Sequence, residues 1–336
     1  FGTYNEGMAY GYMPFASYTS TYDSAIADFY IRCGYTNTDR LILYNEPILL
    51  MDSLLGIKYN RSAYPLLGYK EMEGEAEYNQ KKLYENPYAV GVGYMVSDKA
   101  LIDVSGAENN FEFQNQLLSR ILGREVQCYK KVEARLTKED GNWTWKMNSP
   151  ECENVLYGYL TRRAANQIDI YVDGQFRTDY GVWNSYRTFQ ISDNSSGAPH
   201  TVSMRGEILV EDGVEGIFYY LDLQEFGQAM EELRGKQFTP DVFEDGFVEG
   251  SYSAETDGNL LLTIPFDKGW KISCNGKTVA PQVSQGVFTV IPVQAGENYI
   301  VMEYSLPGFQ YGCVISIFCI ICFAGWQVLA RYRRGK

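Results

Sequence analysis

The sequence predicts an α+β protein: an N-terminal mixed α/β domain followed by jelly-roll-like β-sandwich units, ending in one transmembrane helix. Three observations predict this class. Helically spaced apolar residues are interspersed with short strand-like runs in the first part of the chain. Alternating strands with Asp-Gly or Asn-Gly turns dominate the later part. An uncharged apolar run lies close to the C-terminus.

These signals divide the chain into six expected segments. The polar stretch "TKEDGN" (Thr137–Asn142) marks the first boundary, because it interrupts the apolar pattern. In order, we expect a mixed α/β domain (1–140), a first sandwich unit (141–220), a linking helix and loop (221–247), a second sandwich unit (248–308), a transmembrane helix (309–330) and a basic tail (331–336).

The expected helices have recognisable ends. "TYDSAIADFYIRCG" has apolar residues at helical spacing and Gly34 as a stop. "PILLMDSLLGIKY" predicts a short helix that ends at Gly56, followed by a strand. "NNFEFQNQLLSRILGR" is the clearest helix, capped by Asn109 or Asn110 and ended by Gly123. "LDLQEFGQAMEELRG" predicts another helix later in the chain.

The strands are predicted by alternation and by tight turns. "KKLYENPYAVGVGYMVS" predicts two strands around an Asn86-Pro87 turn. "NQIDIYVDGQ" and "GWKISCNGK" each run into a two-residue turn, and in each case a strand led by glycine follows some 25 residues on. This shared plan indicates two related antiparallel units produced by an internal duplication.

The run "YGCVISIFCIICFAGWQVLA" (residues 311–330) has no charged residue, and as a helix it spans about 30 Å, the thickness of a bilayer core. The basic residues that follow it place the C-terminus in the cytoplasm and residues 1–310 outside. A domain outside the cell needs an upstream export signal. That signal would be either a signal peptide since removed or the earlier membrane segments of a longer protein of which this chain is the C-terminal piece. The third option is a tail-anchored protein with a cytosolic head.

The chain has a formal net charge of −13. Four of the 29 basic residues lie after residue 330 and nothing acidic follows Glu303, so residues 1–310 carry 25 basic and 42 acidic side chains, or −17. Such a surface repels phosphate backbones, which excludes nucleic acid as an expected partner.

No catalytic motif occurs in the sequence, and we expect no catalytic residue, cofactor or metal here. Three of the seven cysteines lie in the apolar run and behave there as small hydrophobic residues. The other four, Cys33, Cys128, Cys152 and Cys274, show no CxxC spacing that would suggest zinc. The single histidine, His200, follows Pro199 and is expected in a surface loop before a strand.

The aromatic residues suggest that the chain binds carbohydrate. Flat rings stack on sugar faces while their polar tips tolerate water. The alternative is that these rings fill sandwich cores or interfaces. The candidate carbohydrate-binding residues are Trp143, Trp145, Trp183, Tyr186, Tyr12 and Tyr18.

Several stretches in order resemble the YfhO family of bacterial polytopic membrane proteins. They are "LMDSLLGIKY", "LYENPYAVGVGYMV", "FEFQNQLLSRILG", "LLLTIPFDKGWKISCNGK", "IPVQAGENYIVMEYSLPGF" and the final apolar helix. The resemblance runs from about residue 20 to the end, and it rests on the ordered set because no single motif is diagnostic.

The resemblance implies a long membrane region upstream of Phe1 and a GT-C-type glycosyltransferase. Such an enzyme would move a sugar from an undecaprenyl-phosphate carrier onto a cell-wall polymer such as lipoteichoic acid. Its catalytic carboxylate would lie in an early loop of that membrane region, so no catalytic residue is carried over to this chain. The implied partners are the bacterial cytoplasmic membrane and a cell-wall glycopolymer or lipid-linked sugar.

Two further functions stay open at this point. The duplicated β units and their aromatic residues are also compatible with a non-enzymatic, membrane-anchored carbohydrate-binding or adhesion module. A flippase or transporter accessory is the third.

Overall fold

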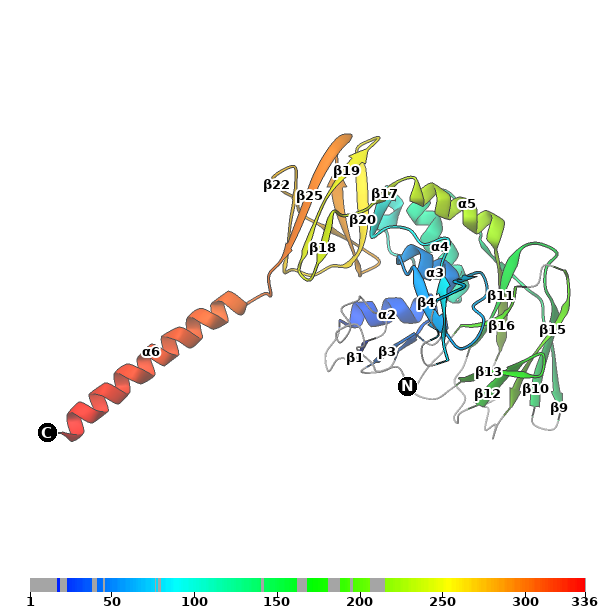
Figure 1. Cartoon of the computed structure of the whole chain (residues 1–336), viewed down its shortest axis with the longest axis horizontal. Coiled ribbons are helices and arrows are strands. Elements are labelled where there is room, and N and C mark those ends of the chain that lie inside the picture. Colours follow the sequence, from blue (N-terminus) through cyan, green and yellow to red (C-terminus); the bar gives the residue numbers. More distant parts are fainter. Residues whose placement is uncertain are drawn as a thin grey trace.

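A computed structural model describes residues 17–18, 23–37, 41–44, 46–75, 77, 80–139, 142–161, 168–180, 188–193, 196–205 and 215–335. A layer of helices lies between two β-sandwiches, and one long helix, α6, extends away from the second sandwich (Figure 1). The α+β class, the sandwich units and the single apolar C-terminal helix are therefore confirmed.

Two of the helices end at the glycines that the sequence predicts, Gly34 and Gly123. Asp23 caps α2 (Ser24–Cys33), and Gly34 ends it in the left-handed conformation. Asn109 caps α4 (Asn110–Leu122) by accepting hydrogen bonds from two backbone N–H groups, and Gly123 ends that helix. The other helices of the middle layer are α3 (Leu49–Leu54), the short 3-10 helix η1 (Asp98–Leu101) and α5 (Leu223–Arg234).

The first sandwich consists of two antiparallel sheets. The outer sheet has the strand order β13-β12-β15-β10-β9 and the inner sheet has the order β14-β11-β16-β8. The strands are β8 (Tyr129–Lys131), β9 (Arg135–Glu139), β10 (Asn142–Asn148), β11 (Asn154–Leu160), β12 (Ile168–Val172), β13 (Gln175–Tyr180), β14 (Phe189–Ser192), β15 (Pro199–Arg205) and β16 (Gly216–Asp222).

The second sandwich pairs the sheets β17-β7-β20-β24-β23 and β18-β19-β25-β21-β22. One of its strands, β7, comes from the N-terminal part of the chain and pairs with β20. The strands are β7 (Gly93–Val96), β17 (Gln237–Phe238), β18 (Val242–Glu244), β19 (Phe247–Ala254), β20 (Gly258–Pro265), β21 (Trp270–Cys274), β22 (Lys277–Thr278), β23 (Gln282–Ser284), β24 (Phe288–Val293) and β25 (Gly296–Tyr304).

Two small sheets accompany the helices. The first has the order β1-β3-β2 and the second has the order β4-β6-β5. Their strands are β1 (Ser17–Tyr18), β2 (Thr36–Asn37), β3 (Leu41–Leu43), β4 (Tyr59–Ser62), β5 (Lys70–Glu71) and β6 (Lys82–Glu85).

The inner sheet of each sandwich is buried on both faces. In β11, Val155 contributes to the helical core while Leu156 contributes to the core of the first sandwich. In β20, Leu261 faces the helical core while Leu260 and Leu262 face the second sandwich. A strand covered on both sides favours apolar residues at consecutive positions, which explains "VLY" (155–157) in β11 and "LLL" (260–262) in β20.

The two predicted turns have the expected geometry. Asp173 and Gly174 both have positive φ, and so do Asn275 and Gly276. Two successive residues of this kind form the type I′ turn that joins antiparallel strands.

The predicted segment boundary at residue 140 lies between two neighbouring strands of the first sandwich. β9 and β10, on either side of it, pair with each other in one sheet. A division into independently folding units at this point stays a prediction.

The expectation that His200 lies in a surface loop is wrong. His200 is part of β15 and is 8% exposed, on the same inward face as Val202 and Met204. Its Nδ1 lies 2.7 Å from Oδ2 of Asp173, in the neighbouring turn. Side chains alternate between the two faces of a strand, and this alternation points the His200 ring inward. By itself, the preceding Pro199 suggests a loop at this position.

α6 (Phe309–Arg334) has none of its residues buried, although most of its length is strongly apolar. At about 1.5 Å per residue its length exceeds 30 Å. Length and composition therefore suit a helix that crosses a membrane.

Candidate functional site

The structure packs two of the predicted sugar-binding rings inside the first sandwich. Trp143 and Trp145 lie on β10 and are 8% and 3% exposed. The Trp145 ring contacts Phe218 at 6.0 Å between centroids, and the Lys138 ammonium lies 3.5 Å from the Trp143 ring centre. The sandwich core and this lysine thus occupy ring faces that a sugar would need, so the core-packing alternative describes both residues.

The other four candidates cannot be placed in the same way. Tyr18 belongs to β1, where its backbone pairs with Leu41. Tyr12, Trp183 and Tyr186 lie outside the described residues. A sugar-binding role for these four stays a prediction.

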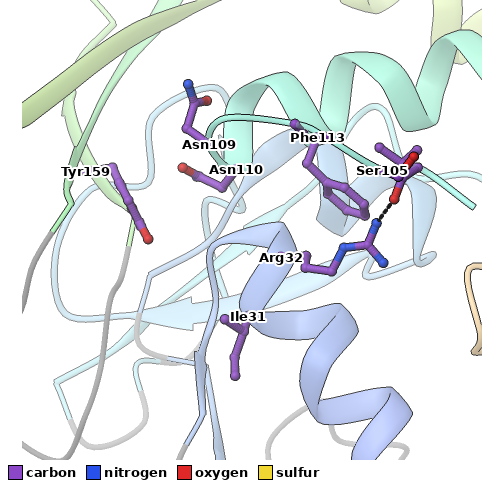
Figure 2. Close-up of a pocket in the computed structure, with 10 residues that line it drawn as sticks. Ile31, Arg32, Ser105, Asn109, Asn110, Phe113 and Tyr159 are labelled. Carbon is purple, nitrogen blue, oxygen red and sulfur yellow. Dashed lines mark hydrogen bonds between the residues drawn. The ribbon is translucent and has the colours of Figure 1, made fainter.

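A cavity of about 350 Å³ lies elsewhere, where the end of α2 meets the start of α4 (Figure 2). Polar and apolar side chains from distant parts of the chain line it, including Arg32 from α2, Asn110 from α4 and Tyr159 from β11. The loop 104–107 forms another side of it.

Asn110 is the most unusual polar residue of the cavity. It is only 6% exposed, and its Nδ2 donates to the Thr188 hydroxyl at 2.7 Å. Its Oδ1 has no hydrogen-bond partner among the described residues. Leaving a buried polar atom unpaired costs about 1–3 kcal/mol, so such atoms are rare in folded proteins.

Arg32 supplies a half-buried positive charge on another side of the cavity. Its guanidinium lies 4.3 Å from the centre of the Phe113 ring and donates a hydrogen bond to the Val104 carbonyl. No carboxylate of the described residues lies within 4 Å of it. Figure 2 shows Arg32 and Tyr159 on opposite sides of Asn110.

A second polar cluster is centred on Asp52 of α3, which is fully buried. Its carboxylate accepts hydrogen bonds from the phenols of Tyr35, Tyr44 and Tyr69. Burial raises the pKa of Asp52 to about 6, and the three phenols, which favour the charged form, offset only part of that rise. The same burial raises the pKa of each phenol, so the phenols stay protonated and act as donors.

The sequence by itself does not mark these residues as functional. Local pattern predicts only a helix-capping role for Asn110 and a position within a short helix for Asp52. One available signal was the lone acidic residue in "LLMDSLL", because a carboxylate within an apolar run needs buried donors. Arg32 gave no comparable signal.

The described residues contain no group of three or more His, Cys, Asp or Glu side chains that could hold a metal ion.

Comparison with known proteins adds one strong match. The sequence model of a family described as "Bacterial membrane protein YfhO" matches residues 2–316. A curated protein, "Uncharacterized protein YfhO" from Bacillus subtilis (strain 168), is 32% identical over 71 residues. That alignment covers 21% of this chain and 8% of the relative.

Similarity to solved structures is low. An "anti-sigma factor domain-containing protein" is 11% identical, with 52% of this chain and 82% of that chain covered and a TM-score of 0.19. A β-D-glucuronidase for Dictyoglomus thermophilum is 12% identical, with 70% of this chain and 38% of that chain covered and a TM-score of 0.20. At these scores neither similarity supports a conclusion about this chain.

Proposed function

Because this chain belongs to the YfhO family of bacterial membrane proteins, we propose that it is the extracytoplasmic part of a membrane glycosyltransferase. The whole protein would transfer a sugar from an undecaprenyl-phosphate carrier to a cell-wall polymer such as lipoteichoic acid. The present residues would help to bind the acceptor. The observation that carries the proposal is the family match over residues 2–316.

The fold supports a role for this chain in binding the acceptor, with catalysis in the membrane region. Two sandwiches and a helical layer form a large folded body beside a single apolar helix, so most of the chain is available to a water-soluble polymer. Arg331, Arg333 and Arg334 follow the apolar part of α6 and favour a cytoplasmic C-terminus. We assign no catalytic residue to this chain. The family resemblance implies that the catalytic carboxylate lies in a loop of the membrane region.

An in-frame deletion of residues 23–305 from the protein that carries this chain tests the proposal. We expect the sugar content of the purified wall polymer, measured by NMR, to fall at least ten-fold. Lys277→Ala, at an exposed position of β22, is the control and should leave the sugar content unchanged. Unchanged glycosylation in cells whose membranes contain the deleted protein would contradict the proposal. A non-enzymatic adhesion module predicts that result, together with loss of cell attachment.

A further inference from the structure

We propose that the cavity between α2 and α4 is a carbohydrate-binding site in which Asn110 and Arg32 hydrogen-bond the hydroxyl groups of one neutral sugar unit. The inference rests on the proposed function in one respect: the bound sugar unit would belong to the acceptor polymer. Binding itself can be tested without any transfer reaction.

The amide of Asn110 calls for a partner that can both donate and accept. One of its two polar atoms is paired with Thr188, and the other is buried without a described partner. If the amide is rotated by 180°, its oxygen and nitrogen exchange places. The Thr188 hydroxyl can then donate to the oxygen, and the nitrogen becomes the atom without a partner. A sugar hydroxyl can likewise take either role, so it satisfies the free atom in both orientations.

Arg32 supplies further hydrogen-bond donors on another side of the cavity. A guanidinium carries five N–H groups, and the described contacts engage it with one carbonyl and one aromatic ring face. The remaining N–H groups can donate to hydroxyl oxygens of a ring held against Asn110.

The surrounding charges favour a neutral ligand over a phosphate. Glu108 and Glu112 lie at the start of α4, and Glu112 already accepts hydrogen bonds at that helix end. Residues 1–310 also carry a net charge of −17. A phosphate would therefore meet nearby carboxylates and an unfavourable long-range field.

The size and lining of the cavity suit a single sugar ring. Its volume of about 350 Å³ is near the lower end of the range of small-molecule pockets. Tyr159 is half-buried on the side opposite Arg32, and its ring provides apolar surface for the face of a sugar. Ser105 and Gly106 are exposed at the rim, so a sugar within a longer polymer could enter from solvent.

The test is saturation-transfer NMR on the full chain in lipid nanodiscs, which avoids maltoside detergents that carry sugars themselves. The probes are the methyl glycosides of glucose, galactose and N-acetylglucosamine. We expect at least one to bind, and we expect Asn110→Leu and Arg32→Gln each to weaken that binding at least ten-fold. Inorganic phosphate should not compete.

Two matched controls come from the same region. Arg120 also donates to carbonyls of the loop before residue 104 but does not line the cavity, so Arg120→Gln should leave binding unchanged. Asn115 is buried on α4 with both amide atoms paired to the Tyr129 backbone, so Asn115→Leu should lower the thermal midpoint of unfolding more than Asn110→Leu.

Three results would overturn the inference: no binding of any of the three glycosides, unchanged binding in both cavity variants, or competition by phosphate. If Asn110→Leu does not fold, the half-buried Arg32→Gln decides the question alone. Because the assay involves no transfer, loss of this binding site and failure of the glycosyltransferase proposal are separate outcomes.

Discussion

At the scale of single residues, Asp52 shows how burial and hydrogen bonding compete. Removing a carboxylate from water disfavours its charged form, while three phenol donors favour that form. Burial is the larger effect, so the pKa of Asp52 in the folded chain is about 6, against 3.8 for an ordinary aspartate. The proton of Asp52 is thus coupled to folding.

This coupling predicts a specific pH dependence. Between pH 3.8 and about 6 the folded chain keeps a proton that the unfolded chain releases. The stabilisation due to Asp52 is therefore complete below pH 3.8 and is lost as the pH rises through about 6. At about 1.4 kcal/mol per pKa unit the total effect is about 3 kcal/mol.

Comparison with Asp52→Asn isolates this effect. We expect the difference in unfolding free energy between the original chain and the variant to fall by about 2 kcal/mol from pH 4 to pH 7, because part of the total effect is already lost at pH 4. Chemical denaturation at several pH values measures it. Asp222 and Glu232, whose pKa values are lowered, act in the opposite direction but cancel because both proteins contain them. A difference that does not vary with pH would show that Asp52 titrates normally.

At the scale of elements, the end of α2 connects helix geometry with the cavity. Gly34 ends the helix at a φ of +96°, a conformation that glycine adopts readily. A Cβ at this position would lie 2.3 Å from the Thr188 hydroxyl and 2.6 Å from Nδ2 of Asn110. The glycine therefore leaves room for the hydrogen bond that fixes one side of the Asn110 amide.

Gly34→Ala should destabilise the protein by at least about 2 kcal/mol, because steric overlap adds to the cost of positive φ. Gly276→Ala is the matched control, because Gly276 also has positive φ (+72°) but has no neighbour within 4 Å of the added Cβ. We expect that control to lose only about 1 kcal/mol. Equal losses in denaturant titrations of the two variants would contradict a steric role for Gly34.

Elements were predicted well where local rules decide them. Asn109 and Gly123 delimit α4, and the Asp-Gly and Asn-Gly pairs mark the turns, because caps and tight turns depend on a few neighbouring residues. Pairing between distant strands follows no such rule. β7 joins the second sandwich by pairing with β20, more than 160 residues later, and no residue within β7 identifies that partner.

At the scale of the whole molecule, α6 relates the folded body to the membrane. The helix has large exposed apolar side chains along its length, such as Ile317 at 58% and Ile320 at 67%. Family membership supports membrane association. The proposed orientation adds that the sandwiches face outward and the basic end faces the cytoplasm.

Cysteine labelling tests the orientation. Most native cysteines are buried or lie within α6, and Cys152 can be replaced by serine to remove the partly exposed one. With a membrane-impermeant maleimide, Lys277→Cys should react in intact cells, whereas Gly335→Cys should react only after permeabilisation. The reverse pattern would place the sandwiches in the cytoplasm.

The sequence alone determined the class of the fold, the ends of the main helices, the tight turns and the apolar C-terminal helix. Each of these depends on interactions within a few residues or on a continuous apolar run. Only the tertiary structure decided that Trp143 and Trp145 pack inward and that Asp52 meets three phenols. It also brought Arg32, Asn110 and Tyr159 to one cavity. These residues are far apart along the chain, and their proximity arises from packing a helical layer between two sandwiches, which no local pattern encodes.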